Sequence, residues 1–180
     1  MPSSSQSVAK SILSDKKHLL YYHRYHYLLR PKVMPILLDV EQAFNEIPPL
    51  SLTKEEFYQC LGMFESLLRK IAGYSFYLSM ETVKEGFKDI NFHSTYTNDE
   101  RKEIVDYIYQ QHESFFNHSI EQVFILSIDS CHLSMKNYFR SYLLSEFSAL
   151  AQTLFKDVFQ YYLMNENINL KGEYLPNISL

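Results

Sequence analysis

Three histidines in the stretch KKHLLYYHRYHYLLRPK are the residues whose spacing first suggests chemistry. In a helix His18, Tyr22 and His26 would share one face in steps of four, with His23 three residues before His26. Helical histidines usually bind a metal ion together with a carboxylate or a cysteine. Asp15 is the one carboxylate nearby, and the chain contains neither H-E-x-x-H nor E-x-x-H. We therefore expect no metal site, but a half-buried helix whose Tyr and His tips reach water.

The same stretch has an unusual charge. Residues 1–35 contain six Lys and Arg but one Asp, whereas the rest of the chain has eleven basic and twenty acidic residues. A cationic, Tyr-rich helix beside an acidic body predicts docking onto that body or onto a protein partner. The predicted docking residues are Lys17, Tyr22, Arg24, Tyr25 and Arg30. Leu19, Tyr22, His26 and Leu29 are expected to point inward. The net charge of −4 and the absence of a nucleic-acid motif argue against nucleic acid as the partner.

A second histidine cluster lies in QQHESFFNHS. A haem protein needs an axial histidine in an apolar pocket, and His112 or His132 would be the candidates. The alternative is that His112 is exposed and that His118 lies near the C-terminus of a helix, where a cation is favourable.

The segment SIDSCHLS places Asp129 and His132 one helical turn apart, with Cys131 next to the histidine. Consecutive helical side chains diverge by about 100°, so Cys131 and His132 are not expected to form a catalytic pair. The four glycines are never closer than eleven residues, which excludes a phosphate-binding loop. No catalytic residue is assigned.

Glycine and proline define the fold class. No proline occurs between Leu50 and Leu175, and only four glycines interrupt that span. A β-rich domain of this length would need many more turn residues. We predict an all-α single domain of six to seven helices, packed as a bundle or in a globin-like manner. Its divisions are a polar leader with a short helix (1–13), a helical domain (14–165) and an extended tail (166–180).

Helix ends were predicted from local signals. A helix is expected from about residue 14 to Arg30, ending at Pro31, with Pro35 in the first turn of the next helix. Thr53 and Glu56 form a capping box that begins a helix ending at Gly73, and a shorter helix is expected over 75–88. Further capping boxes are Thr97 with Glu100 and Ser119 with Gln122. Residues 120–164 would form one bent helix or two long ones.

An apolar core pocket is a further expectation. Its predicted lining residues are Phe64, Leu67, Phe116, Phe124, Ile128 and Phe147, with His132 or Arg140 at its polar end. Such a pocket would suit a fatty-acid-like ligand. The function expected is therefore that of a non-enzymatic regulatory or sensory domain acting through protein–protein contacts, with this apolar ligand optional. The alternatives are a haem- or metal-binding helical protein and a ligand-free oligomerising adaptor.

Two cysteines and the absence of a signal peptide predict a cytoplasmic protein without disulfides. The longest strongly apolar run, VFILSI, is far shorter than the roughly 20 residues that span a bilayer. Apolar residues on more than one face of 120–164 predict a homodimer.

Overall fold

The all-α prediction is confirmed in a computed structural model that describes residues 4–46, 52–86, 96–131, 133–138, 140 and 144–164. No strand occurs within these ranges. The helices are α1 (Ser5–Ser14), α2 (Lys16–Arg24), α3 (His26–Glu46), α4 (Lys54–Gly86), α6 (Asn98–Ile128), α7 (Leu133–Tyr138) and α8 (Leu144–Met164). The predicted tail, 166–180, lies outside the described residues.

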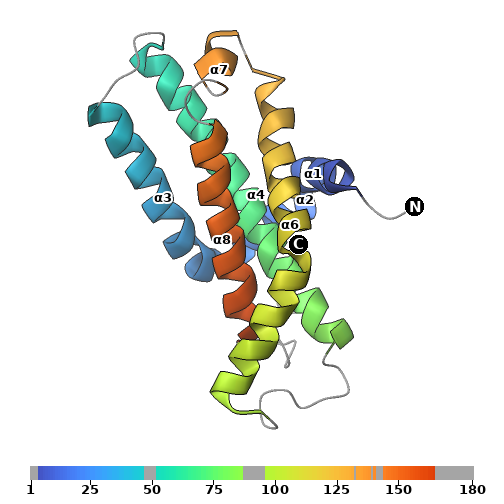
Figure 1. Ribbon diagram of the computed structural model, residues 1–180. Helices are drawn as coiled ribbons and strands as arrows, with labels where there is room; N and C mark the ends of the chain where they lie inside the picture. Colours follow the sequence, from blue (N-terminus) through green and yellow to red (C-terminus); the bar gives the residue numbers. More distant parts are fainter. Residues whose placement is uncertain are drawn as a thin grey trace.

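The helices form a bundle around α4 (Figure 1). Helix α8 packs along α4, α6 packs against α8, and α3 stands at the edge of the bundle against α4 and α8. The short helices α1 and α2 lie across α6 and α4, respectively. None of the described helices is long and apolar enough to cross a membrane.

Two of the three predicted capping boxes are present. The N–H of Glu56 donates to Thr53 Oγ1 and the N–H of Thr53 donates to Glu56 Oε1, each at a distance of 3.1 Å. Thr97 and Glu100 make the same reciprocal pair at the start of α6. The third prediction is wrong: Ser119 lies inside α6 and its hydroxyl donates to the Phe115 carbonyl (2.8 Å). A mid-helix serine can bond its own helix in this way, so the residue pattern did not mark a start.

The prediction that a helix ends at Pro31 is also wrong. The helical hydrogen bonding is interrupted earlier, at Tyr25, and α3 then runs through both Pro31 and Pro35. Each proline removes one backbone donor, but both are exposed, so water can satisfy the carbonyl groups left without a helical partner.

Gly73 does not end a helix, because α4 continues to Gly86 as one element and includes the separate helix predicted over 75–88. A Cβ atom on Gly73 would lie 1.8 Å from the carbonyl oxygen of His18 and 3.3 Å from the Tyr22 nitrogen. The glycine therefore serves the close approach of α2 to α4 rather than termination.

Residues 120–164 form neither of the two predicted arrangements. Helix α6 ends at Ile128, and α7 and α8 follow as separate helices. At the break the Ser127 carbonyl accepts hydrogen bonds from the Ser130 hydroxyl (2.8 Å) and from Cys131 Sγ (3.4 Å). These side chains compete with the helical backbone donors, which explains the end of α6.

Aromatic rings from α4, α6 and α8 fill the core. Phe64 of α4 stacks on Phe147 of α8 with ring centroids 3.9 Å apart. Phe76 makes an edge contact with Tyr162 at 4.7 Å. Such ring pairs add to the burial of apolar area that stabilises the bundle.

Candidate partner-binding surface on α3

Helix α3 is apolar on two faces, and only one of them is buried. Its inner face packs in the core through Leu29, Val33, Leu37 and Val40. Its outer face carries Tyr27, Pro31, Pro35 and Leu38, which we name the α3 stripe; all four are exposed, Tyr27 to 57% and Leu38 to 59%. Steps of four, four and three residues align these side chains along one side of a helix.

Local sequence patterns do not reveal this surface, because Pro31 and Pro35 both indicate helix boundaries. Once α3 is continuous, Tyr27 and Leu38 lie on the same side, three turns apart. The available signal was the apolar spacing across the two prolines.

Exposed tyrosines from neighbouring helices flank α3. Tyr161 of α8 is 48% exposed, and Lys32 Nζ lies 5.1 Å from its ring centroid. Tyr58 of α4 is 41% exposed, and its hydroxyl lies 3.5 Å from Glu41 Oε1. Aromatic side chains with polar tips are enriched at protein interfaces, so both flanks suit contact with a partner.

Charge is divided along α3. Its first half carries Arg30 and Lys32, whereas its second half carries Asp39, Glu41 and Glu46. The surface of α3 is therefore basic toward the N-terminus of the helix and acidic toward its C-terminus.

A pocket of about 340 Å³ opens beside the stripe, between α2–α3 and α4. It is lined by Tyr22, His23, His26, Arg30, Met34, Glu65 and Arg69.

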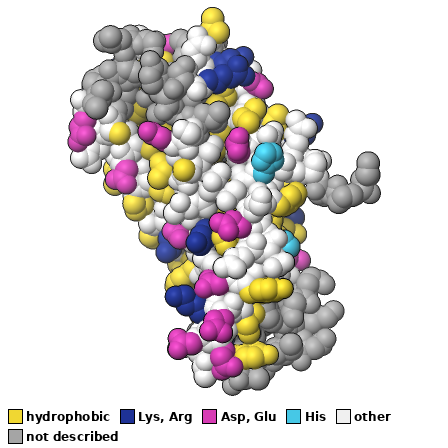
Figure 2. All heavy atoms as spheres, in the orientation of Figure 1, with side chains coloured by type: hydrophobic (Ala, Val, Ile, Leu, Met, Phe, Trp, Pro, Cys, Tyr) yellow, Lys and Arg dark blue, Asp and Glu magenta, His cyan; other side chains and the backbone are white. Residues whose placement is uncertain are grey.

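Elsewhere the surface differs in charge: acidic side chains gather at the end of the molecule where α6 begins (Figure 2).

The predicted docking residues divide into two groups. Lys17 and Arg24 are partly exposed and Arg30 is exposed, whereas Tyr22 and Tyr25 are 4% and 1% exposed and belong to the core. Their inclusion in a docking surface is thus corrected. Tyr25 packs on Phe76 with ring centroids 4.4 Å apart, and burial raises the pKa of its hydroxyl. The docking role of the three cations stays a prediction.

The prediction that Leu19, Tyr22, His26 and Leu29 point inward is partly right. Tyr22 and Leu29 are buried and Leu19 is half-buried, but His26 is exposed. The reason for the difference is the break at Tyr25, which changes the helical register between α2 and α3.

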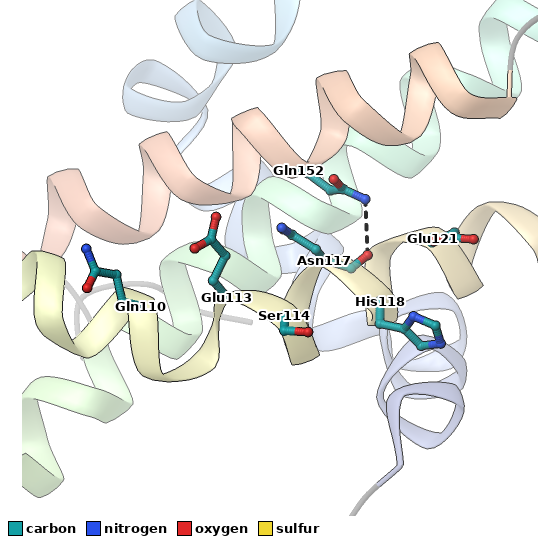
Figure 3. A pocket seen from close by; sticks show the side chains of 7 residues that line it. All are labelled: Gln110, Glu113, Ser114, Asn117, His118, Glu121 and Gln152. Atoms are coloured by element: carbon teal, nitrogen blue, oxygen red, sulfur yellow. Dashed lines mark hydrogen bonds between the residues drawn. The ribbon is translucent and has the colours of Figure 1, made fainter.

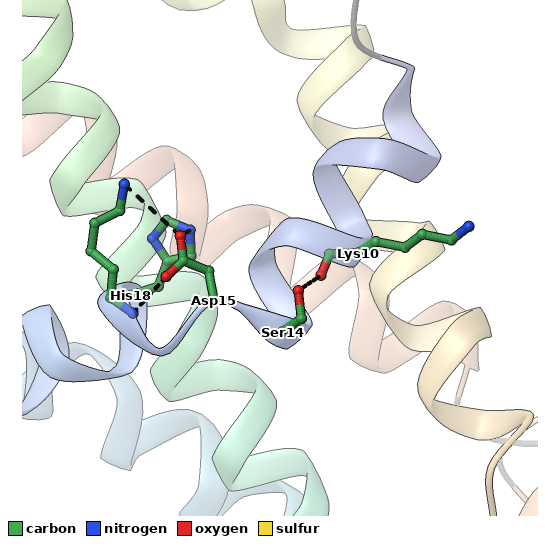
Figure 4. Close-up of polar contacts among 5 residues, drawn as sticks. Lys10, Ser14, Asp15 and His18 are labelled. Carbon is green, nitrogen blue, oxygen red and sulfur yellow. Dashed lines mark hydrogen bonds and ion pairs between the residues drawn. The ribbon is translucent and has the colours of Figure 1, made fainter.

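His18 is the one histidine among the described residues that is buried, with 2% exposure, so its ring does not reach water as predicted. It makes an edge contact with Tyr74 (5.2 Å) and a tilted contact with Tyr77 (5.7 Å). Figure 4 shows the ring beside Asp15, whose Oδ2 lies 4.0 Å from Nε2. Desolvation lowers the pKa of His18, and the Asp15 carboxylate only partly opposes this.

The residues of the predicted core pocket are brought together only in part. Phe64 contacts the rings of Phe124 and Phe147, whereas Phe116 packs on Phe155 of α8. Leu67 and Ile128 are also buried. Arg140 lies on the surface, where it pairs with Asp129, and His132 lies outside the described residues. The ligand pocket stays a prediction.

The second histidine cluster lies on the surface of α6. His112 and His118 are both exposed, and His118 is in the middle of α6 rather than near its end. His118 is one of seven residues that line a polar groove of about 530 Å³ on α6 beside α8, and its ring points away from α8 (Figure 3). There the Gln152 side chain donates to the Asn117 carbonyl over 3.2 Å. No group of three potential metal ligands occurs in the described part of the chain.

No protein-family model, curated protein or solved structure matches this chain.

Proposed function

We propose that this chain is a non-enzymatic interaction domain that pairs with a second copy of itself along the α3 stripe. One observation carries the proposal: α3 has two apolar faces, and the bundle covers only one of them. A contiguous exposed apolar surface on a folded domain marks a contact site. Tyr161 and Tyr58 widen this surface on its two flanks.

The charge pattern of α3 favours a second copy as the partner. In an antiparallel pair related by a two-fold axis, the basic first half of each α3 faces the acidic second half of the other. Arg30 and Glu41 are eleven residues apart, about three full turns, so they lie on the same side of the helix. An axis between Pro35 and Ile36 would bring Arg30 of one copy opposite Glu41 of the other. Exposed ion pairs contribute little affinity, but they select the orientation.

The interaction role is the one expected from the sequence, but the proposed interface lies on the α3 stripe and not on residues 120–164. The sequence pattern placed the contact on 120–164, but most apolar side chains of α8 are buried in the core of a single chain. The surplus of apolar residues there is accounted for by α8 packing against both α4 and α6.

Sedimentation velocity of the full chain at micromolar concentration tests the proposal. We expect the wild type to sediment as a dimer and Leu38→Glu as a monomer, since a buried interface does not tolerate an unpaired carboxylate. Leu133→Glu is the matched control, because Leu133 is 71% exposed on α7, outside the stripe. A wild-type monomer at every concentration would refute the proposal, as would equal effects of the two substitutions.

A charge exchange tests the orientation. Arg30→Glu and Glu41→Arg should each weaken the dimer, and the double variant should restore it. Equal weakening by all three variants would exclude the antiparallel pairing. Association of the wild type only with a different protein would assign the stripe to a foreign helix instead.

A further inference from the structure

The pocket beside the stripe has two facing walls with hydrogen-bond donors. Helices α2 and α3 contribute His23, His26 and Arg30, together with Tyr22 and Met34. Helix α4 contributes Arg69 and Glu65 on the other wall. Two guanidinium groups and two imidazoles thus face a single carboxylate.

The Arg69 side chain is held in position by its neighbours, but not all of its hydrogen-bond donors have an acceptor. Its Nη2 donates to Glu65 one turn earlier in α4, and its guanidinium carbon lies 5.6 Å from the Tyr22 ring centroid. Its Nε is buried and has no hydrogen-bond partner among the described residues. A guanidinium carries five N–H donors, and the bond to Glu65 uses one of them, so further donors remain for a ligand oxygen.

A hydrogen bond to the backbone fixes the orientation of the His26 ring at the pocket. Its Nδ1 lies 3.0 Å from the carbonyl oxygen of His23, so the Nδ1–H donates there and Nε2 remains available. The side chains of His23 and His26 are both exposed at the pocket.

We propose that this pocket binds a tetrahedral oxyanion of the phosphate class. Arginine binds phosphate and carboxylate through paired N–H donors. A planar carboxylate presents two oxygens and would engage one wall, whereas a phosphate group can accept from Arg69 on one wall and from Arg30 on the other. Free phosphate and a phosphorylated side chain share this chemistry.

A ¹H–¹⁵N titration of the full chain with sodium phosphate at constant ionic strength tests the proposal without any partner protein. Saturable shifts are expected for the pocket residues. Arg69→Gln should weaken binding about tenfold or more, since a charged hydrogen-bond donor is lost. Arg69→Lys should fall in between, because it keeps the charge without the fork.

Lys10→Gln is the matched control, since it removes one exposed cation from α1, outside the pocket. Shifts that never saturate, or an equal loss in Lys10→Gln, would overturn the proposal. If Arg69→Gln fails to fold, Arg30→Gln on the opposite wall tests the pocket, with sedimentation velocity run beside it because Arg30 also faces Glu41 in the proposed dimer.

Two further probes separate the sources and the histidines. Tighter binding of blocked phosphoserine than of inorganic phosphate would assign the pocket to a phosphorylated side chain, and equal binding to the free ion. His26→Ala should also weaken phosphate binding at constant pH, because the ring of His26 lines the pocket. Equal binding by His26→Ala and the wild type would overturn the role of His26.

Discussion

The carbonyl oxygen of His18 lies directly against Gly73. A Cβ atom on that glycine would be 1.8 Å from this oxygen and 2.7 Å from the carbonyl carbon. The backbones of α2 and α4 are therefore in contact, and the side chain of His18 is buried beside Tyr74 and Tyr77 as a result.

Gly73→Ala should destabilise the fold strongly. The obstructing atoms belong to a helix backbone, which cannot rotate away, so we expect a loss of about 3 kcal/mol or more in the free energy of unfolding. Gly62→Ala is the control in the same helix: its Cβ meets nothing within 4 Å, and the substitution should stabilise by about 0.5–1 kcal/mol. Urea denaturation measures both. Similar effects at the two glycines would contradict this crossing of α2 and α4.

Acid should weaken the fold through His18. Burial lowers the pKa of this imidazole below its ordinary value of 6.5, so the unfolded chain takes up a proton that the folded chain resists. The contribution is fully present above about pH 6.5 and is lost as the pH falls, by at most about 1.4 kcal/mol per pH unit. His18→Leu should flatten this dependence, whereas His23→Leu, at an exposed position, should not. Parallel pH profiles of the wild type and His18→Leu, from urea unfolding, would count against it.

The two thiols should differ in reactivity. Cys60 is 1% exposed, and burial raises the pKa of its thiol to about 12. Cys131 is half-buried with Sγ 3.4 Å from the Met63 sulfur, and its pKa is raised for the same reason. Because alkylation needs both a thiolate and access, iodoacetamide should modify Cys131 first and Cys60 only on unfolding. Peptide mapping by mass spectrometry checks this order, and the reverse order would show that the burial of Cys60 is wrong.

Phe64→Ala distinguishes a packed core from a ligand pocket. Phe64 contacts Phe124 and Phe147, so its truncation should cost about 3–5 kcal/mol if these rings are close-packed. Phe115→Ala is the control, since Phe115 is 37% exposed and its loss should cost far less. A small effect of Phe64→Ala in chemical denaturation would instead support the predicted cavity.

Features that depend on neighbouring residues could be predicted from the sequence. The helical class follows from the distribution of proline and glycine, and the starts of α4 and α6 follow from Thr53 with Glu56 and Thr97 with Glu100. A capping box closes its hydrogen bonds within four residues, so no distant part of the chain is needed to specify it.

Local signals misled where distant segments decided the outcome. By propensity Pro31 ends a helix and Pro35 begins one, yet packing of the inner face of α3 on α4 and α8 outweighs the lost hydrogen bonds. That continuity also creates the α3 stripe and places Arg30 opposite Arg69 across the pocket, two residues that are 39 positions apart in the chain.

The amino-acid sequence by itself determined the helical class, two capping boxes and the uneven charge, because each depends on composition or on hydrogen bonds within one turn. Only the tertiary structure decided that Gly73 allows the close approach of α2 and does not end a helix. It also decided that His18 and Tyr25 are buried and that α3 keeps an exposed apolar face. These features depend on which helices meet, and the contacts between helices far apart in the chain outweigh local preference.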